Sequence, residues 1–429
     1  MGRSRQHRGQ GVKRYSALAL ARQAIAGHDG WPQAWRSPEP KPRYGVVIIG
    51  GGGHGLATAY YLAKKHGIRD VAVIEKGWIG GGNSGRNTTI VRSDYFYAAS
   101  AAFFEHSLKL YEGLSRELNF NIMLSQRGSL TLSHSRHEAD FQRRVVNAMR
   151  LNGIDGEMMT RDQVREFCPI LNFAPDARFP IHGGMIQRRA GTVRHDAVVW
   201  GYARAADALG VDIIQNCEVT GFRRDPATGA VTGVETTRGE IACDRVGLAT
   251  AGHSTVVAER AGFRLPLTSY ALQAFVSEPL KPVLDTVIGS SVINSYASQS
   301  DKGGIVAGGG IDAFPSYAQR GSPATAEKVI AGLVELIPSF SRIRLLRQWA
   351  GIVDYARDSS PIIGPSPVPG IFLNCGWGGG GFKAIPGGGD VFAHLIATGT
   401  PHPLTRAFGL HRFREAALVD EAAAAGIEH

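Results

Sequence analysis

The sequence predicts an α/β protein of two domains, one built on buried parallel strands and the other a strand-rich α+β domain. Three observations carry this prediction. The chain has 429 residues, more than one compact core usually accommodates. Short apolar runs typical of buried parallel strands recur near residues 46, 250 and 375. Strand-rich segments lie between these runs, so the first domain is expected to be assembled from separate parts of the chain.

Residues 44–77 have the pattern of a complete βαβ unit. An apolar, β-branched run at 46–49 predicts a parallel strand buried on both faces. Residues 56–66 then predict a helix, and the apolar residues 71–74 predict the second strand. A unit of this kind brings the carboxyl ends of two neighbouring strands to one edge of a sheet.

Gly50, Gly52 and Gly55 lie between the first strand and the helix in the spacing GxGxxG. Without Cβ atoms the chain can turn tightly and bring backbone N–H groups close to a pyrophosphate. Glu75 ends the second strand, 20 residues after Gly55, where a carboxylate can accept both ribose hydroxyls. The unit therefore predicts a dinucleotide site. Glu75 would repel the 2′-phosphate of NADP, which leaves NAD or FAD.

The remaining elements alternate between helical and extended patterns. Residues 80–89 form a second loop rich in glycine and hydroxyl groups, which suits another phosphate or a flat ring close to the backbone. Further helices are predicted at 16–26, 103–118, 195–209, 323–337 and 382–397. Further strands are predicted at 128–133, 184–187, 211–215, 218–223, 231–236, 245–250 and 371–374. A dinucleotide domain in three separate pieces is unlike a simple NAD dehydrogenase and favours a two-domain flavoprotein.

These patterns give an expected domain organisation. We expect a dinucleotide domain at 44–128, 195–262 and 351–405, a substrate domain at 129–194 and 263–350, a basic extension with a proline-rich connector at 1–43, and a C-terminal tail at 406–429.

Composition narrows the class of protein. Hydrophobic residues make up 43% of the chain and charged residues 20%, as in a soluble globular protein, and no apolar run reaches the length of a membrane span. The net charge is +10, but the basic residues are scattered. We therefore expect a small anionic substrate or an acidic partner rather than nucleic acid or a membrane. The acid-poor N-terminal segment is interpreted as a solvated arm or a partner-docking helix, with mitochondrial import as the alternative.

The four cysteines, Cys168, Cys217, Cys243 and Cys375, are far apart and form no CxxC motif. They are expected to be buried, reduced thiols of a cytoplasmic protein, and metal ligation is not expected.

Several segments resemble the beta subunits of heterotetrameric sarcosine oxidases, and the similarity extends from residue 36 to the C-terminus. The segments are 50–63, 85–93, 192–198, 206–222, 272–278 and 380–384. The resemblance implies a glutathione-reductase-like FAD-binding domain joined to a substrate domain, as in D-amino acid oxidase and monomeric sarcosine oxidase.

The resemblance also implies an activity and a set of partners. In this family an amine oxidase is formed with alpha, gamma and delta subunits. Sarcosine gives its N-methyl hydride to non-covalent FAD in the beta subunit, and the electrons pass to an FMN at the interface with the alpha subunit. Oxygen collects them there as hydrogen peroxide. The one-carbon unit leaves as formaldehyde, or as methylenetetrahydrofolate when tetrahydrofolate is bound to the alpha subunit.

Cofactor contacts are assigned by the same resemblance. Besides the three glycines of the GxGxxG turn, FAD contacts are expected at Gly53, His54, Glu75, Asn83, Arg86, Thr88, Thr89, Ile90, Val219 and Tyr270. Gly376, Gly379 and Gly381 belong to the loop expected to face the isoalloxazine ring. His195 would carry the FMN through a covalent bond to the flavin 8α carbon. Without the resemblance, a histidine before Asp196 at a helix start would more often be a cap or a surface residue.

Two basic residues are the expected substrate and catalytic groups. Lys383 lies where a glycine-rich loop becomes a helix, so its ammonium could hold a carboxylate or stabilise negative charge on the reduced flavin. Arg92 matches the position at which related amine oxidases hold the substrate carboxylate. The alternative for Lys383 is a solvated surface lysine, and the alternative for Arg92 is an arginine at a strand end in a structural salt bridge. No strong base is required, because a neutral amine can pass hydride directly to the flavin.

The chain departs from the family pattern at a few positions. Tyr270 replaces a histidine that is usual in the flavin region, and Gly45 stands where an aspartate commonly precedes the first strand. Residues 354–358 are also unusual near the expected pocket, which leaves the identity of the amine open. A stand-alone FAD dehydrogenase for another N-methyl or D-amino acid, and a flavin-holding scaffold without chemistry of its own, are the alternative hypotheses.

Overall fold

The computed structural model describes residues 17–29 and 33–421, and within these residues the strands form two eight-stranded sheets and one two-stranded sheet. The first sheet has the order β17-β18-β11-β1-β2-β8, with β10 and β9 attached to β11. Its strands are β1 (Arg43–Ile49), β2 (Val71–Ile74), β8 (Asp212–Ile214), β9 (Val219–Arg224), β10 (Val231–Thr236), β11 (Gly239–Leu248), β17 (Ile362–Pro365) and β18 (Ile371–Cys375). β1 runs parallel to both β2 and β11, so three pieces of chain that are distant in sequence share one sheet.

Helices cover one face of the first sheet. They are α2 (Gly53–Lys65), α3 (Ala98–Glu117), α6 (His195–Ala208) and α9 (Ile385–Thr398). Their fully buried side chains, such as Leu56, Phe103, Tyr202 and Phe392, form one continuous apolar core with the strands. The other face is covered by β9, β10 and α7 (Ser254–Arg260) around a second core.

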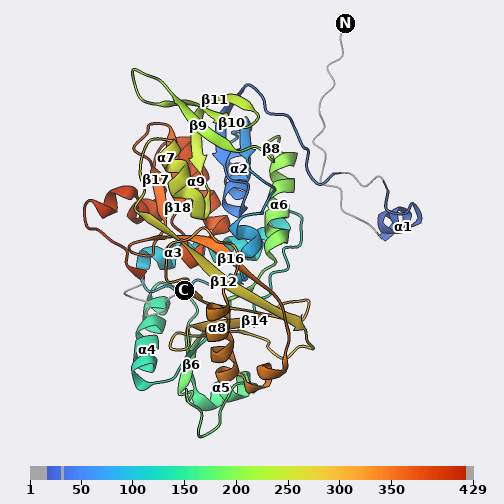
Figure 1. The fold of residues 1–429 in the computed structure, drawn as a ribbon, viewed down its shortest axis with the longest axis vertical. Helices are drawn as coiled ribbons and strands as arrows, with labels where there is room; N and C mark the ends of the chain where they lie inside the picture. Colours follow the sequence, from blue (N-terminus) through green and yellow to red (C-terminus); the bar gives the residue numbers. More distant parts are fainter. Residues whose placement is uncertain (1–16, 30–32, 422–429) are drawn as a thin grey trace.

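The second sheet lies below the first in Figure 1, in the order β16-β12-β15-β14-β13-β4-β6-β5. Its strands are β4 (Ser129–Ser133), β5 (Glu157–Thr160), β6 (Gly183–Gln187), β12 (Leu267–Pro279), β13 (Val287–Ser290), β14 (Ser295–Gln299), β15 (Gly304–Ile311) and β16 (Leu345–Ala356). The helices α4 (Arg136–Leu151), α5 (Arg161–Phe167) and α8 (Pro323–Leu336) pack on it. The long strands β12 and β16 cross the middle of the molecule (Figure 1).

Short elements complete the fold. β3 (Ile90–Val91) pairs with β7 (Gly191–Thr192) in the two-stranded sheet. The 3₁₀ turns η1 (Asn83–Arg86), η2 (Ala251–His253) and η4 (Gly378–Gly380) contact β16. Helix α1 (Ala17–Ile25) has no buried residue. The rest of the predicted N-terminal extension lies mostly outside the described residues.

The structure differs from the expected elements in several places. Helix α4 was not predicted, although Ser135 caps it by accepting a hydrogen bond from the Glu138 backbone. Helix α5 was also not predicted. The expected domain boundary at residue 351 falls inside β16, because this strand continues the second sheet until Ala356 and pairs with β12 along its length.

Two further observations bear on the expected class of protein. All four cysteines are buried and free, as predicted. Among residues 17–29 and 33–421, none of the helices combines the length and the apolar character that crossing a bilayer requires.

Candidate active site

A cavity of about 570 Å³ opens at the carboxyl ends of β1, β2 and β11. Its walls are the glycine turn after β1, the loop at 81–88, the strands β12 and β16, and the loop at 377–381. Ligands of open α/β sheets bind at this end of the strands. The second sheet closes the cavity from the opposite side, so the cavity lies where the two sheets meet.

The glycine turn after β1 depends on the absence of side chains. Gly50 has a φ of +112°, in the region that favours glycine. A Cβ at Gly55 would lie 1.9 Å from the carbonyl oxygen of Gly50. Only glycine therefore lets α2 begin directly against the turn, with its first N–H groups at the cavity wall.

Glu75 holds this turn from the end of β2. Its carboxylate accepts the backbone N–H of Gly51 at 2.8 Å and that of Gly77 at 2.9 Å. The side chain lines the cavity beside the glycine turn, as the dinucleotide interpretation requires.

The second glycine-rich loop is fixed between α2 and β16. The Ser84 hydroxyl accepts the backbone N–H of Gly53 at 2.9 Å, and the Asn83 side chain accepts that of Ile352 at 3.0 Å. Arg86 donates to the carbonyl of Gly82 at 3.0 Å. These hydrogen bonds hold the loop along the cavity.

The loop that closes the far end of the cavity is held by His54 and Asp354. The His54 Nε2 donates to the Gly381 carbonyl at 2.8 Å, and its ring lies 4.7 Å from the Trp377 ring. Burial lowers the pKa of His54 to about 4, so the ring is neutral near pH 7. The Asp354 carboxylate accepts the N–H of Gly376 at 2.6 Å, and burial raises its pKa to about 6.

A smaller cavity of about 140 Å³ adjoins the larger one. Thr88, Tyr296, Gly379 and Phe382 line both, and the Thr88 hydroxyl donates to the Tyr296 hydroxyl at 3.2 Å. Residues of β4 and β13, both apolar and hydroxyl-bearing, form part of its remaining wall. Its size suits a small polar molecule.

Two cationic side chains line this smaller cavity. The Arg92 side chain is 11% exposed, pairs with Asp94, and lies over the Tyr95 ring at 5.3 Å. Lys383 is 7% exposed, so it is not a solvated surface lysine. Its Nζ donates to the Gly379 carbonyl at 3.4 Å. Burial, with the nearby charge of Arg92, lowers the pKa of Lys383 well below its ordinary value. A guanidinium, beside an amine that an entering anion would help to protonate, favours an anionic ligand in this small cavity.

The sequence-predicted site residues fall into three groups. The larger cavity is lined by Gly50, Gly52, Gly53, His54, Glu75, Asn83, Arg86, Thr88, Val219, Gly379 and Gly381. The smaller cavity is lined by Thr88, Thr89, Ile90, Arg92, Gly379 and Lys383. The remaining predicted site residues, all within the described part of the chain, line neither of these two cavities: Gly55, His195, Tyr270 and Gly376.

His195 is separate from both cavities. It is the first residue of α6 and is half-buried, between Arg194 and Asp196, which pair with each other at 2.8 Å. Burial lowers the pKa of the imidazole, which keeps it neutral near pH 7.

Sequence reasoning missed three residues of the site. Tyr296, on β14, lies between the two cavities, and Trp377 packs on His54. Asp354 was noticed as a departure from the family pattern, not as a group that binds the Gly376 backbone. The sequence of β14, SYASQ, has no hydrophobic alternation, so no local pattern indicated which of its side chains faces the seam between the sheets.

A dinucleotide cradle joined to a second sheet, with a small cationic cavity between them, defines a two-domain flavin-dependent oxidoreductase. Comparison with known proteins agrees. The model of the FAD dependent oxidoreductase family matches residues 45–395. The chain is 53% identical to the sarcosine oxidase subunit beta of Rhodobacter capsulatus, over 97% of this chain and 100% of that protein. It is 56% identical to the same subunit of Rhizobium meliloti, over 95% and 97%.

Solved structures confirm the predicted fold. The L-proline dehydrogenase of P. horikoshii matches with a TM-score of 0.82 and 27% identity, covering 89% of this chain and all of that one. The glycine oxidase of Geobacillus kaustophilus matches with a TM-score of 0.77, covering 87% and 99%. The chain therefore belongs to the FAD-dependent oxidoreductases and, within them, to the family of sarcosine oxidase beta subunits.

Proposed function

We propose that this chain oxidises sarcosine with FAD, as the beta subunit of a multi-subunit enzyme. The observation that carries the proposal is the pair of basic side chains, Arg92 and the buried Lys383, in a cavity of about 140 Å³ next to a cavity of dinucleotide size. Membership of the sarcosine oxidase beta family selects sarcosine from the small amino acids that such a cavity suits.

The residues of the larger cavity fit FAD. Glu75 would accept the ribose hydroxyls, and the N-terminus of α2 would face the pyrophosphate across the glycine turn. The side-chain-free stretch at Gly379 and Gly381 would face the flat ring. When bound there, FAD supplies a two-electron acceptor for the oxidation of a carbon–nitrogen bond.

The smaller cavity would orient the substrate. Arg92, and Lys383 once it is protonated, would hold the carboxylate, which leaves the N-methyl group directed toward the larger cavity. Positive charge in the cavity also disfavours the ammonium form of the substrate and favours the neutral amine that the reaction needs. The overall reaction consumes sarcosine, oxygen and water, and gives glycine, formaldehyde and hydrogen peroxide.

The proposal includes a second flavin and partner subunits. We assign His195 as the attachment site of a covalent FMN, because the segment 192–198 resembles the family and the imidazole is neutral and separate from the FAD cavity. Alpha, gamma and delta subunits would complete the enzyme, and tetrahydrofolate on the alpha subunit would accept the one-carbon unit. The four free, buried cysteines suit the cytoplasm, where thiols stay reduced.

The non-covalent FAD and the covalent FMN of the proposal can be tested on one sample. The chain is co-expressed with candidate partner subunits, precipitated with acid, and analysed by mass spectrometry and visible spectroscopy. We expect FAD in the supernatant and a flavin on the peptide that contains His195, which is absent in His195→Asn. Release of all flavin as FAD would refute the FMN assignment and favour a single-flavin amine dehydrogenase.

A further inference from the structure

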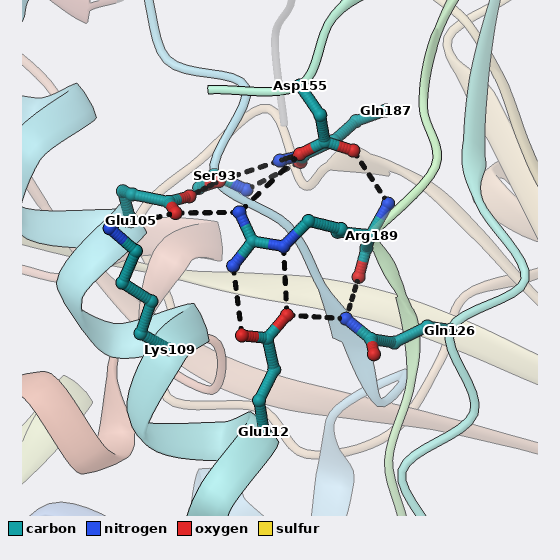
Figure 2. A network of polar contacts seen from close by, with 8 residues as sticks. All are labelled: Ser93, Glu105, Lys109, Glu112, Gln126, Asp155, Gln187 and Arg189. Atoms are coloured by element: carbon teal, nitrogen blue, oxygen red, sulfur yellow. Dashed lines mark hydrogen bonds and ion pairs between the residues drawn. The ribbon is translucent and has the colours of Figure 1, made fainter. Parts of the chain in front are cut away.

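Arg189 is the centre of a charged network at the seam between the two sheets (Figure 2). It lies in the turn between β6 and β7. Its guanidinium donates to both oxygens of Glu112, at 2.9 and 3.0 Å, and to Glu105 at 2.7 Å. Its backbone N–H donates to Asp155 at 2.8 Å. Glu105 and Glu112 lie two turns apart on one face of α3, so the network fastens this helix to the second sheet.

The network ends on Ser93, which is fully buried. The Ser93 hydroxyl donates to Glu105 at 2.8 Å and accepts from the side-chain amide nitrogen of Gln187 at 2.7 Å. The Ser93 backbone N–H donates to the side-chain Oε1 of Gln187 at 2.8 Å. Gln187 in turn donates to Asp155 at 3.1 Å. A buried serine with all of these partners has one well-defined position.

Ser93 is flanked by Arg92 and its ion-pair partner Asp94. Arg92 lines the smaller cavity, and Ser93 points the other way, into the network. The strand that precedes Arg92, β3, pairs with β7, which follows Arg189. The chain that carries Arg92 is therefore held on one side by the strand pair and on the other by the network.

We infer that Arg189 is a positioning residue for substrate binding. Through Glu105 and Ser93 it sets the position of Arg92, and with it the affinity of the cavity for a carboxylate. This inference rests on the proposed function of Arg92.

The charges explain why an arginine is needed. Three carboxylates, Glu105, Glu112 and Asp155, converge on Arg189, and Glu105 is only 8% exposed. Lys109 approaches Glu105 at 3.5 Å from the solvent side and cannot bridge to Glu112 and Asp155 as a planar fork does. Without Arg189 the carboxylates would repel one another, and the acceptor of the Ser93 hydroxyl would move.

The test compares Arg189→Met and Ser93→Ala in the complete complex with the wild type. Arg188→Met is the matched control, because Arg188 is the neighbouring residue but pairs with Glu157 on the surface. The probe is acetate, a carboxylate without the amine, titrated by the change in flavin absorbance. FAD content, and KM and kcat for sarcosine, are measured on the same samples.

We expect Arg189→Met and Ser93→Ala to weaken acetate binding and raise the KM for sarcosine about tenfold, with a smaller change in kcat and full FAD content. Arg189→Lys should give an intermediate value, and Arg188→Met should match the wild type. If Ser93→Ala and Arg189→Met both bind acetate as tightly as the wild type, the role of Arg189 is refuted while the proposed function stands. A loss of FAD content without a change in KM would refute it in the same way. If Arg189→Met does not fold, Ser93→Ala decides. A wild type that neither binds acetate nor reacts with sarcosine would overturn the proposed function and this inference with it.

Discussion

Replacing Lys383 by methionine is expected to weaken substrate binding without weakening the fold. The lysine is 7% exposed, and its hydrogen bond to the Gly379 carbonyl is long, at 3.4 Å. Burial, reinforced by the charge of Arg92, lowers its pKa well below the ordinary value. A charged ammonium is therefore costly at this position until an anion enters the cavity. Methionine keeps a similar length and removes the charge.

The expected effects on binding and stability have opposite directions. A hydrogen bond between an ammonium and a carboxylate contributes about 1.5–3 kcal/mol. Its loss in Lys383→Met should raise the dissociation constant for a carboxylate by roughly 10- to 150-fold. The free energy of unfolding should stay unchanged or rise, because an apolar side chain replaces a buried amine.

The assay is a titration of Lys383→Met with acetate at several pH values, alongside urea unfolding. In the wild type, affinity should be highest below the pKa of Lys383 and fall as the pH rises through it, because only the ammonium attracts the carboxylate. Lys383→Met should lack this dependence. Acetate binding as tight as in the wild type, or a large loss of stability, would refute the reasoning.

Three other predictions concern the fold and the cradle. Arg412 and Asp358 form an ion pair at 2.7 Å, and their side chains are 1% and 0% exposed, respectively. Arg412→Leu leaves the buried Asp358 carboxylate without this partner, so the free energy of unfolding in urea should fall by about 3–5 kcal/mol. A loss below about 1 kcal/mol would contradict this. Gly55→Ala should abolish FAD retention, because its Cβ would lie 1.9 Å from a carbonyl oxygen. Gly113→Ala, on α3 outside both cavities and with no atom within 4 Å of its Cβ, should retain FAD. Equal FAD content in the two purified variants would refute the argument. The pKa of His54 is lowered from 6.5 to about 4 in the folded protein, so between these pH values protons bind preferentially to the unfolded chain. The free energy of unfolding is therefore expected to fall as the pH falls from 6.5 to about 4. Because glutamine does not titrate, the free energy of unfolding of His54→Gln should fall less steeply than that of the wild type, by up to about 1.4 kcal/mol per pH unit. Equal slopes of the free energy of unfolding against pH in the two proteins would contradict the prediction.

Local patterns were sufficient for the dinucleotide half of the fold. The periodicity of β1, the glycine spacing and the position of Glu75 each depend on residues that are close in sequence, and the structure places Glu75 against the glycine turn. Helix α4 also carried a local signal, the cap formed by Ser135 and Glu138, which the sequence reasoning did not use.

The second sheet could not be assembled in the same way. β13 runs parallel to β4, although more than 150 residues separate them, and β12 pairs with β16 along most of its length. Such pairings depend on packing between distant segments rather than on local propensity. For this reason the sequence did not indicate that β16 continues the second sheet past residue 351.

The site likewise combines residues that the sequence predicted with contacts that depend on distant segments. Arg92 was predicted from a resemblance, and Lys383 from its position between a glycine-rich loop and a helix. The structure places both along the smaller cavity. The side chain of Tyr296 that separates the two cavities, and the contacts that join Ser93 to Arg189, arise only when the two sheets come together. No local pattern encodes these contacts.

The most direct test of the proposed function is an anaerobic titration of the complete complex with sarcosine, followed by flavin absorbance and product analysis. The account predicts that sarcosine bleaches the FAD and yields glycine and formaldehyde in stoichiometric amounts, and that Lys383→Met requires a higher sarcosine concentration. FAD that stays oxidised in a fully assembled complex with sarcosine in excess would contradict it.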